Sequence, residues 1–248
     1  MRFYPGAWRF LLPVLIMLGG SGPALAQVYS GELGSLAAQA AFTVQGDHLH
    51  ITFVNTSPAP ALTNADVLSA LYFTVWGASP FSLSSGAIGL APSSFYTDTS
   101  TGKDTNPDDL GQYWAFKQLA GLAPFPGAAV YGIGSAGFGI FGPQNTFLPS
   151  SGNLVVNADY GLVSGVGENG DSGLNSPLIQ NGADIVLNGF TPGDMITNVS
   201  FQFGTTAQDA NLPGSVTPTP NSFVVGAGAL VFGLIWIRRE NRRRQPMV

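Results

Sequence analysis

The sequence predicts an all-β fold, and three observations lead to that prediction. Its apolar runs are short and are separated by turn-forming residues, among them 33 glycines and 18 prolines in 248 residues. One stretch alternates strictly between apolar and polar residues on both sides of a two-residue turn. Cysteine is absent, so a buried core rather than disulfide bonds has to stabilise the fold. We therefore expect one β-sandwich over residues 27–213, with a jelly roll as its more specific form.

Residues 1–26 are typical of a secretory signal peptide. Positive charge comes first, an apolar stretch follows, and small residues precede the expected cleavage point: Arg2 and Arg9, then Phe10–Leu18, then Ala24-Leu25-Ala26. Gln27 is then the first residue of the mature chain. An uncleaved N-terminal anchor is the alternative, but the apolar stretch is short and the cleavage site is well formed, which favours cleavage.

Residues 42–53 predict a β-hairpin. Apolar and polar residues alternate on both sides of Gly46-Asp47, and glycine at the first turn position suits a type II′ turn. A loop of two residues places all the apolar side chains on one face of the hairpin. The expected cross-strand pairs are Val44 with Leu49 and Phe42 with Ile51.

Four further segments have the composition of strands. Within the first of them, Leu71, Phe73 and Val75 share one face. The turn Thr191-Pro192-Gly193-Asp194 separates the last two, and the polar connection 97–111 is expected on the surface. The four segments are 67–76, 113–119, 183–187 and 199–203.

The expected mature portion, residues 27–220, is strongly acidic. Its 194 residues include Lys103 and Lys117 as their only basic side chains and thirteen of the fourteen acidic ones, so its formal charge is −11 against −5 for the whole chain. A field of that sign argues against nucleic acid and anionic lipid as partners of this portion. It suits solubility outside the cell, and it leaves cation binding open.

His48 and His50 are the only two histidines of the chain. They lie at i and i+2 on the outer face of the hairpin, about 7 Å apart, so they could share a metal ion. Zinc needs a third and usually a fourth ligand, and the cross-strand neighbours Thr43 and Gln45 are poor ligands. Two solvated histidines are the alternative that we favour. A Ser-His-Asp triad is not excluded, but no Gly-x-Ser-x-Gly elbow supports it.

Oxygen ligands are concentrated in an acidic loop, residues 104–109. The loop departs from an EF-hand because Pro107 interrupts it, aspartate occupies the usual glycine position, and Ala115 stands at the twelfth place. Glu168-Asn169-Gly170-Asp171 is a second oxygen-rich turn. Solvated loops of an acidic protein explain both segments and are the interpretation that we favour, so we expect no cofactor, and calcium is the alternative. The candidate ligands are Asp104, Asn106, Asp108 and Asp109.

Aromatic side chains offer a second hypothesis, a stacking platform for sugars. Because alternate residues of a strand face opposite sides, some of these side chains must instead pack in the core. The candidates are Trp76, Tyr113, Trp114 and Phe116.

The C-terminal residues form a proline-containing stem (214–222), an apolar run (223–237) and a basic end (238–248). The apolar run would rise roughly 22 Å as a helix, which is short against a hydrocarbon core of about 30 Å, and snorkelling arginines make up part of the difference. The arginines that follow the run should stay cytoplasmic, which places residues 27–220 outside. A buried terminal helix is the alternative, but the run is apolar on all sides.

Eight residues of this tail carry a family resemblance: Pro218, Thr219, Pro220, Arg238, Arg239, Arg242, Arg243 and Arg244. With the apolar run between them, they resemble the PEP-CTERM sorting signal of bacterial exosortase-dependent surface proteins. Thr219 stands where the family motif has a glutamate. The resemblance implies that an exosortase-type membrane enzyme processes the tail and releases or re-anchors the protein at the cell surface.

Four apolar and glycine-rich segments between the two ends are similar to one group of these exosortase-dependent proteins. That group has no assigned biochemical activity, so the resemblance implies a shared architecture and no particular function. The segments are 112–116 (QYWAF), 131–142 (YGIGSAGFGIFG), 177–180 (PLIQ) and 198–204 (NVSFQFG).

Three classes of function follow from the sequence. The first, which we favour, is a non-enzymatic exported protein of the cell surface or of the extracellular polysaccharide matrix. The second is a carbohydrate- or calcium-binding surface module. The third is a secreted hydrolase, for which the sequence contains no recognisable catalytic motif.

Overall fold

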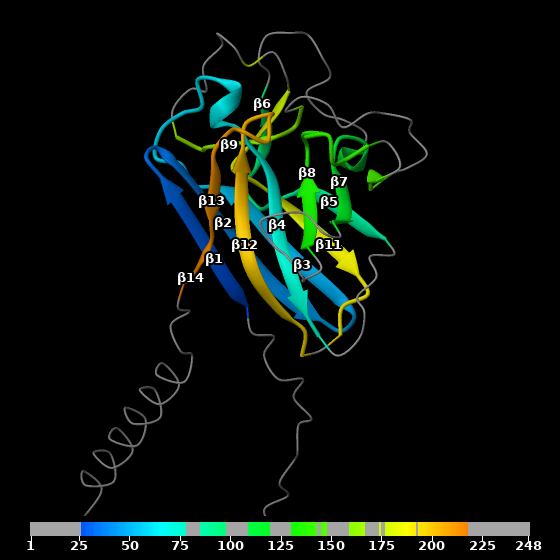
Figure 1. Cartoon of the computed structure of the whole chain (residues 1–248). Helices are drawn as coiled ribbons and strands as arrows, with labels where there is room; N and C mark the ends of the chain where they lie inside the picture. Colours follow the sequence, from blue (N-terminus) through cyan, green and yellow to red (C-terminus); the bar gives the residue numbers. More distant parts are fainter. Residues whose placement is uncertain are drawn as a thin grey trace, which may run out of the picture.

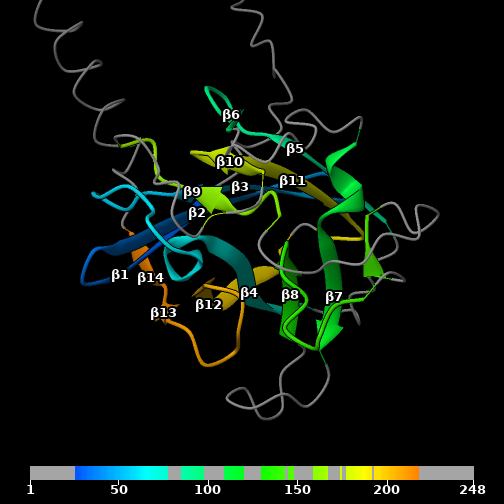
Figure 2. The same ribbon diagram turned by 90° about the horizontal axis from the view of Figure 1, so that it is seen from above.

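Two β-sheets make up the part of the chain that the computed structural model describes, which is residues 26–77, 85–97, 109–119, 130–142, 145–147, 159–166, 174, 177–191 and 193–217. The expected all-β fold is confirmed. Figure 1 shows the strands, and Figure 2 shows β1, β2, β3 and β11 in one layer and β4, β7, β8 and β12 in another.

The first sheet has six strands, all paired antiparallel. In spatial order they are β14 (Ser215–Thr217), β1 (Gln27–Leu33), β2 (Leu36–Gln45), β3 (His48–Asn55), β11 (Gly182–Asn188) and β5 (Gly86–Leu90).

The second sheet has eight strands and is mixed, because β9 and β10 pair in parallel. Its main path is β13 (Asn211–Pro213), β12 (Met195–Phe203), β4 (Leu68–Trp76), β9 (Leu162–Val163), β10 (Leu178–Gln180) and β6 (Phe95–Thr97). Two more strands extend from β4: β8 (Val130–Gly134), then β7 (Ala115–Leu119). Two short 3₁₀ helices complete the description, η1 (Asn64–Asp66) and η2 (Leu110–Gln112).

Aromatic side chains from both sheets meet in the core. Phe42 of β2 contacts Phe73 of β4 with ring centroids 5.4 Å apart, and Phe53 of β3 stacks on Phe201 of β12 at 6.2 Å. Burying one such ring contributes about 1.5–3 kcal/mol. Trp114 lies in the same core at 0 % exposure, and its indole N–H donates to the carbonyl oxygen of Tyr160 at 3.1 Å. The buried indole therefore has the polar partner that it needs.

The hairpin β2–β3 has the predicted register. Gln45 pairs with His48 across the turn, and Gly46 has φ of 63°, as the first position of a type II′ turn requires. The inward side chains of β3 are buried, whereas His48 is exposed and His50 partly so. The two predicted pairs are both present, Val44 with Leu49 and Phe42 with Ile51.

Three other predicted strands correspond to β4, β11 and β12; the bounds of β4 and β11 differ from the prediction by one residue, and β12 begins four residues earlier. The predicted turn between the last two is also present: the Asp194 N–H donates to the carbonyl oxygen of Thr191 at 3.0 Å. The strand predicted over 113–119 begins two residues late, at Ala115. The reason is that Tyr113 has helical dihedral angles and caps η2.

Both ends of the described fold lie side by side. Val28 near the start of β1 pairs with Thr217 at the end of β14, and Figure 1 shows the start of β1 and the end of β14 at one end of the sheets, with β6 at the other. We call these the proximal and the distal end. Residues 215–217, which the sequence analysis assigned to the stem, belong to the fold as β14.

No helix in the described ranges is long and apolar enough to cross a membrane. The expected signal peptide (1–26, except Ala26) and the apolar run 223–237 lie outside those ranges, as do the stem residues from Pro218 and the basic end.

Candidate functional site

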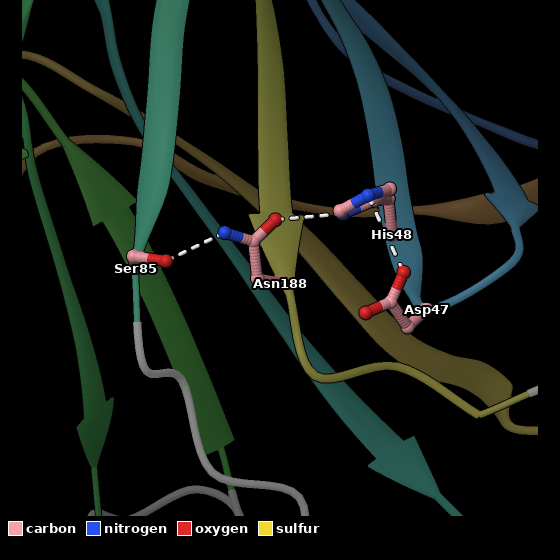
Figure 3. Close-up of polar contacts among 4 residues, drawn as sticks. All are labelled: Asp47, His48, Ser85 and Asn188. Atoms are coloured by element: carbon pink, nitrogen blue, oxygen red, sulfur yellow. Dashed lines mark hydrogen bonds and ion pairs between the residues drawn. The ribbon is translucent and has the colours of Figure 1, made fainter.

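A polar cluster on the surface joins four residues at neighbouring strand ends of the first sheet (Figure 3). His48 Nδ1 lies 2.7 Å from Asn188 Oδ1, and Asn188 Nδ2 donates to Ser85 Oγ at 2.5 Å. The other imidazole nitrogen, His48 Nε2, lies 3.3 Å from Asp47 Oδ1. Strand pairing explains the arrangement, because β3 and β11 place His48 directly opposite Asn188. We call these four residues the edge cluster.

The edge cluster contains a serine, a histidine and an aspartate, but not in the order of a catalytic triad. Asn188 separates Ser85 from the imidazole, and its amide donates to the serine oxygen. A nucleophilic serine instead needs a base at hydrogen-bond distance that accepts its proton. Both ring nitrogens of His48 already face Asn188 and Asp47. The geometry therefore supports a structural role, in which these side chains connect neighbouring strand ends, rather than activation of Ser85.

The two histidines lie as the hairpin predicts, with ring centroids 6.4 Å apart and Thr43 and Gln45 as their cross-strand neighbours. Within the described ranges, no group of three or more His, Cys, Asp or Glu side chains could hold a metal ion. Sequence reasoning missed Asn188 and Ser85, because their proximity to His48 depends on β11 lying between β3 and β5.

The acidic loop is described only at its last residue. Asp104, Asn106 and Asp108 lie outside the described ranges, as does the second oxygen-rich turn, 168–171. Asp109 is the N-cap of η2, and its Oδ1 accepts a hydrogen bond from the Gly111 N–H at 2.7 Å. This carboxylate therefore has a structural role, and calcium binding stays a prediction.

Three other aspartates share one kind of turn, Thr-x-x-Asp, of which only Thr191–Asp194 was predicted as a turn from the sequence. In each turn the threonine N–H donates to Oδ2 of the aspartate, at 2.9, 2.9 and 2.8 Å, and the aspartate N–H donates back to the threonine carbonyl. The reciprocal bonds resemble a capping box and lock the turn. The pairs are Thr63–Asp66, Thr191–Asp194 and Thr206–Asp209.

These turns change the interpretation of the acidic composition. Asp66, Asp194 and Asp209 accept backbone hydrogen bonds, so an oxygen of each already has a donor. The spacing recurs in the sequence at Thr101–Asp104 and Thr105–Asp108, outside the described ranges. The spacing Thr-x-x-Asp is thus the signal that could have found the turns, since threonine and aspartate both favour local contacts with the backbone.

The four aromatic residues proposed as a sugar platform do not share a surface. Trp114 is in the core, Phe116 packs on Phe147 with centroids 4.7 Å apart, and Trp76 is exposed at the end of β4. Tyr113 has different neighbours: its ring centroid is 4.3 Å from that of Tyr160. The platform as predicted is therefore not formed.

Tyr113 belongs instead to a tyrosine cluster, which consists of Tyr96, Tyr113 and Tyr160. Tyr160 is buried between the other two, which are partly exposed, and its centroid lies 5.8 Å from that of Tyr96. Burial raises the pKa of Tyr160, and contact with Tyr113 and a hydrogen bond to it raise it further. The pKa of Tyr96 is raised by burial and by the charge of Asp109. These two hydroxyls stay protonated at neutral pH and can both donate and accept hydrogen bonds.

A small polar pocket lies where the start of β2, the end of β3 and η1 meet. Its volume of about 10 Å³ leaves space for about one water molecule. Its polar groups are bonded to the protein: the Asn55 amide donates to the Leu162 carbonyl at 3.0 Å, and the Ala37 N–H donates to Ser57 Oγ at 3.0 Å. The pocket is too small for an organic ligand.

Among the residues expected at the signal-peptide cleavage site and in the C-terminal sorting signal, the structure describes Ala26 and Gln27. Gln27 is the first residue of β1, and its side-chain oxygen accepts a hydrogen bond from the Ile196 N–H at 3.3 Å. Comparisons with protein-family models, with curated proteins and with solved structures find no match to this chain. Its function therefore has to be argued from its own residues.

Proposed function

We propose that this protein is a non-enzymatic, exported surface protein, in which a β-sandwich is attached to a membrane by a C-terminal helix. The observation that carries the proposal is the pairing of Val28 with Thr217. The expected cleavage site before Gln27 and the stem that continues from Thr217 thus leave the fold at the same end. A domain attached in this way presents its distal end to the surroundings. The jelly-roll form of the sandwich stays a prediction.

The sequence of the tail supports the membrane attachment independently. An uncharged apolar run followed by five arginines is inserted with the basic end in the cytoplasm. The two observations complement each other, because a domain whose N-terminus is released by cleavage is held by its C-terminus alone.

Single-cysteine labelling tests this topology, since the chain has no cysteine of its own. In cells whose outer layers have been removed, a membrane-impermeant maleimide should label Leu62→Cys, an exposed position just before η1. Val248→Cys should react only after the membrane is permeabilised, in molecules that retain their tail. Labelling of Val248→Cys but not Leu62→Cys in intact membranes would overturn the proposal, as would recovery of both variants in the cytosol.

We also infer that an exosortase-type enzyme is a partner that acts on the anchored chain and later removes the helix, and that it tolerates Thr219 in place of glutamate. Both prolines, the apolar run and the arginines stand in the order that the sorting signal requires. Intact-mass measurement in a host with an active exosortase should find a chain that lacks the helix and the basic end. A mature chain that still ends at Val248 would contradict this inference.

Carbohydrate binding is a second candidate function, and the tyrosine cluster favours it. Tyr96 and Tyr113 are partly exposed and phenolic, and both rings pack on buried Tyr160. Aromatic faces next to hydroxyl groups suit sugars, which have apolar faces and polar edges. Extracellular polysaccharide is thus the ligand class. A glycan array should show binding that Tyr96→Ala weakens and Leu62→Ala, at another exposed apolar position, does not. Equal loss in both variants would argue against this site.

A further inference from the structure

Trp76 and Met195 form an exposed apolar pair at the proximal end. They are directly opposed residues of β4 and β12, and 59 % and 55 % of their respective surfaces are exposed. In the next cross-strand pair, Val75 packs against the core and Ile196 belongs to it. Because neighbouring residues of a strand face opposite sides, Trp76 and Met195 both lie on the outer face of the second sheet. We call these two residues the proximal pair.

The proximal pair adjoins the point at which the described fold begins. The Ile196 N–H donates to Gln27 Oε1 at 3.3 Å, and the Tyr29 hydroxyl donates to the Ile196 carbonyl at 2.5 Å. Tyr29 in turn pairs with Val216 of β14. Ile196, the residue after Met195, therefore contacts β1. β1 lies beside β14, the strand that ends at Thr217.

The length of the chain beyond Thr217 limits how far this end can be from the apolar run. Six residues lead from Thr217 to Phe223, and fully extended they span at most about 20 Å. The nine residues of β12 already extend over about 30 Å. The connection from Thr217 to Phe223 is thus shorter than β12. A membrane that holds the apolar run therefore lies close to the proximal end.

We propose that Trp76 and Met195 insert into the lipid headgroup region of the membrane that anchors the chain. This inference rests on the proposed membrane anchor. A tryptophan side chain has a large apolar ring and one N–H donor, which suits the boundary between headgroups and acyl chains. Lys117 is the only lysine or arginine of the described ranges, so attraction to anionic lipid does not drive the contact. The tether supplies a high local concentration instead, and the partner is a zwitterionic lipid surface.

The four tryptophans of the chain make the test direct. The expected mature chain, from Gln27 to Val248, is prepared with Trp236→Phe, which leaves exposed Trp76 and core Trp114. It is reconstituted in phosphatidylcholine vesicles in which some acyl chains carry bromine close to the headgroup. We expect brominated lipid to reduce the emission of Trp76. The same background with Trp76→Phe reports Trp114 alone, which should lose no emission.

A matched control places the reporter at the distal end. In the background without Trp76, Phe95→Trp introduces an indole at a position of similar exposure, 53 %. It should be quenched by acrylamide in the water phase and not by brominated lipid. Flotation with the vesicles establishes the anchor separately. If the chain floats and Trp76 is not quenched by lipid, the inference is wrong and the anchor stands. If the chain does not float, the proposed anchor and this inference both fail.

Discussion

Ile51 and His50 are consecutive residues of β3 in opposite environments. Ile51 is 1 % exposed in the core, whereas His50 lies on the outer face opposite Thr43 and Val186. Ile51→Asp buries an unpaired charge and should cost more than about 4 kcal/mol, enough to unfold a marginally stable domain. His50→Ala should change the free energy of unfolding by less than about 0.5 kcal/mol. Urea unfolding of both variants checks this, and comparable losses would mean that the register is shifted.

Tyr72 predicts how the fold responds to alkali. Burial raises its pKa from 10.0 to about 12, so the folded state keeps its proton at pH values at which the unfolded chain has lost it. The free energy of unfolding is therefore unaffected below pH 10 and falls as the pH rises to 12, by about 2 kcal/mol from this group. Tyr72→Phe should reduce the decline, as measured by urea unfolding at a series of pH values. An identical decline in the variant would show that Tyr72 titrates normally.

At the scale of single residues, the sequence predicts inward and outward side chains where alternation is strict. It places Leu49, Ile51 and His50 correctly, because each faces one of two sides. It does not predict that Asn188 and Ser85 join His48, because three strand ends have to be placed next to one another first. The Thr-x-x-Asp turns are different, since their contacts are local and their spacing is visible in the sequence.

Among the elements, β8 explains why glycine is repeated in residues 131–142. Phe141 packs over this strand, and a Cβ atom at Gly134 would lie 2.8 Å from its ring and 3.0 Å from the Cβ of Ala70. Gly134→Val should therefore destabilise the fold by about 1–3 kcal/mol through overpacking. Gly89 of β5 is the matched control, since a Cβ there meets no atom within 4 Å. Gly89→Val should be neutral or slightly stabilising, because glycine is costly in a strand. Thermal unfolding distinguishes the two, and equal losses would contradict this role of Gly134.

Whether an element could be predicted depended on its length and on what surrounds it. β3 and the second half of β2 carry bulky alternating side chains around a glycine turn, so pattern and turn agree. The first half of β2 is mostly alanine and was missed, because alanine is a poor strand former. Strands of two or three residues, such as β9 and β13, are stabilised by their neighbours and have no pattern of their own.

For the whole molecule, the decisive feature is the position of the two chain ends, which the sequence alone could not provide. The sequence predicts where a leader and a stem begin, but their spatial relation depends on β14 pairing with β1, about 190 residues away along the chain. The proximal pair depends on the same pairing. Trp76 was visible in the sequence as an aromatic residue, and only the ladder between β4 and β12 places it with Met195 beside the chain ends.

A circular permutant tests this arrangement of the ends. Thr217 is joined to Gln27 by a linker of about four residues, and new ends are opened between Gly34 and Ser35, in the turn where Gly34 has φ of 62° and no atom near its Cβ position. Opposed residues of paired strands are about 5 Å apart, whereas four residues span up to about 14 Å. The permutant should therefore unfold cooperatively, with a urea midpoint close to that of the unpermuted domain. A second permutant with a linker of about 20 residues is the control. If only the long linker permits cooperative unfolding, the two ends are not neighbours, and the proposal of a domain held at one end loses the observation that carries it.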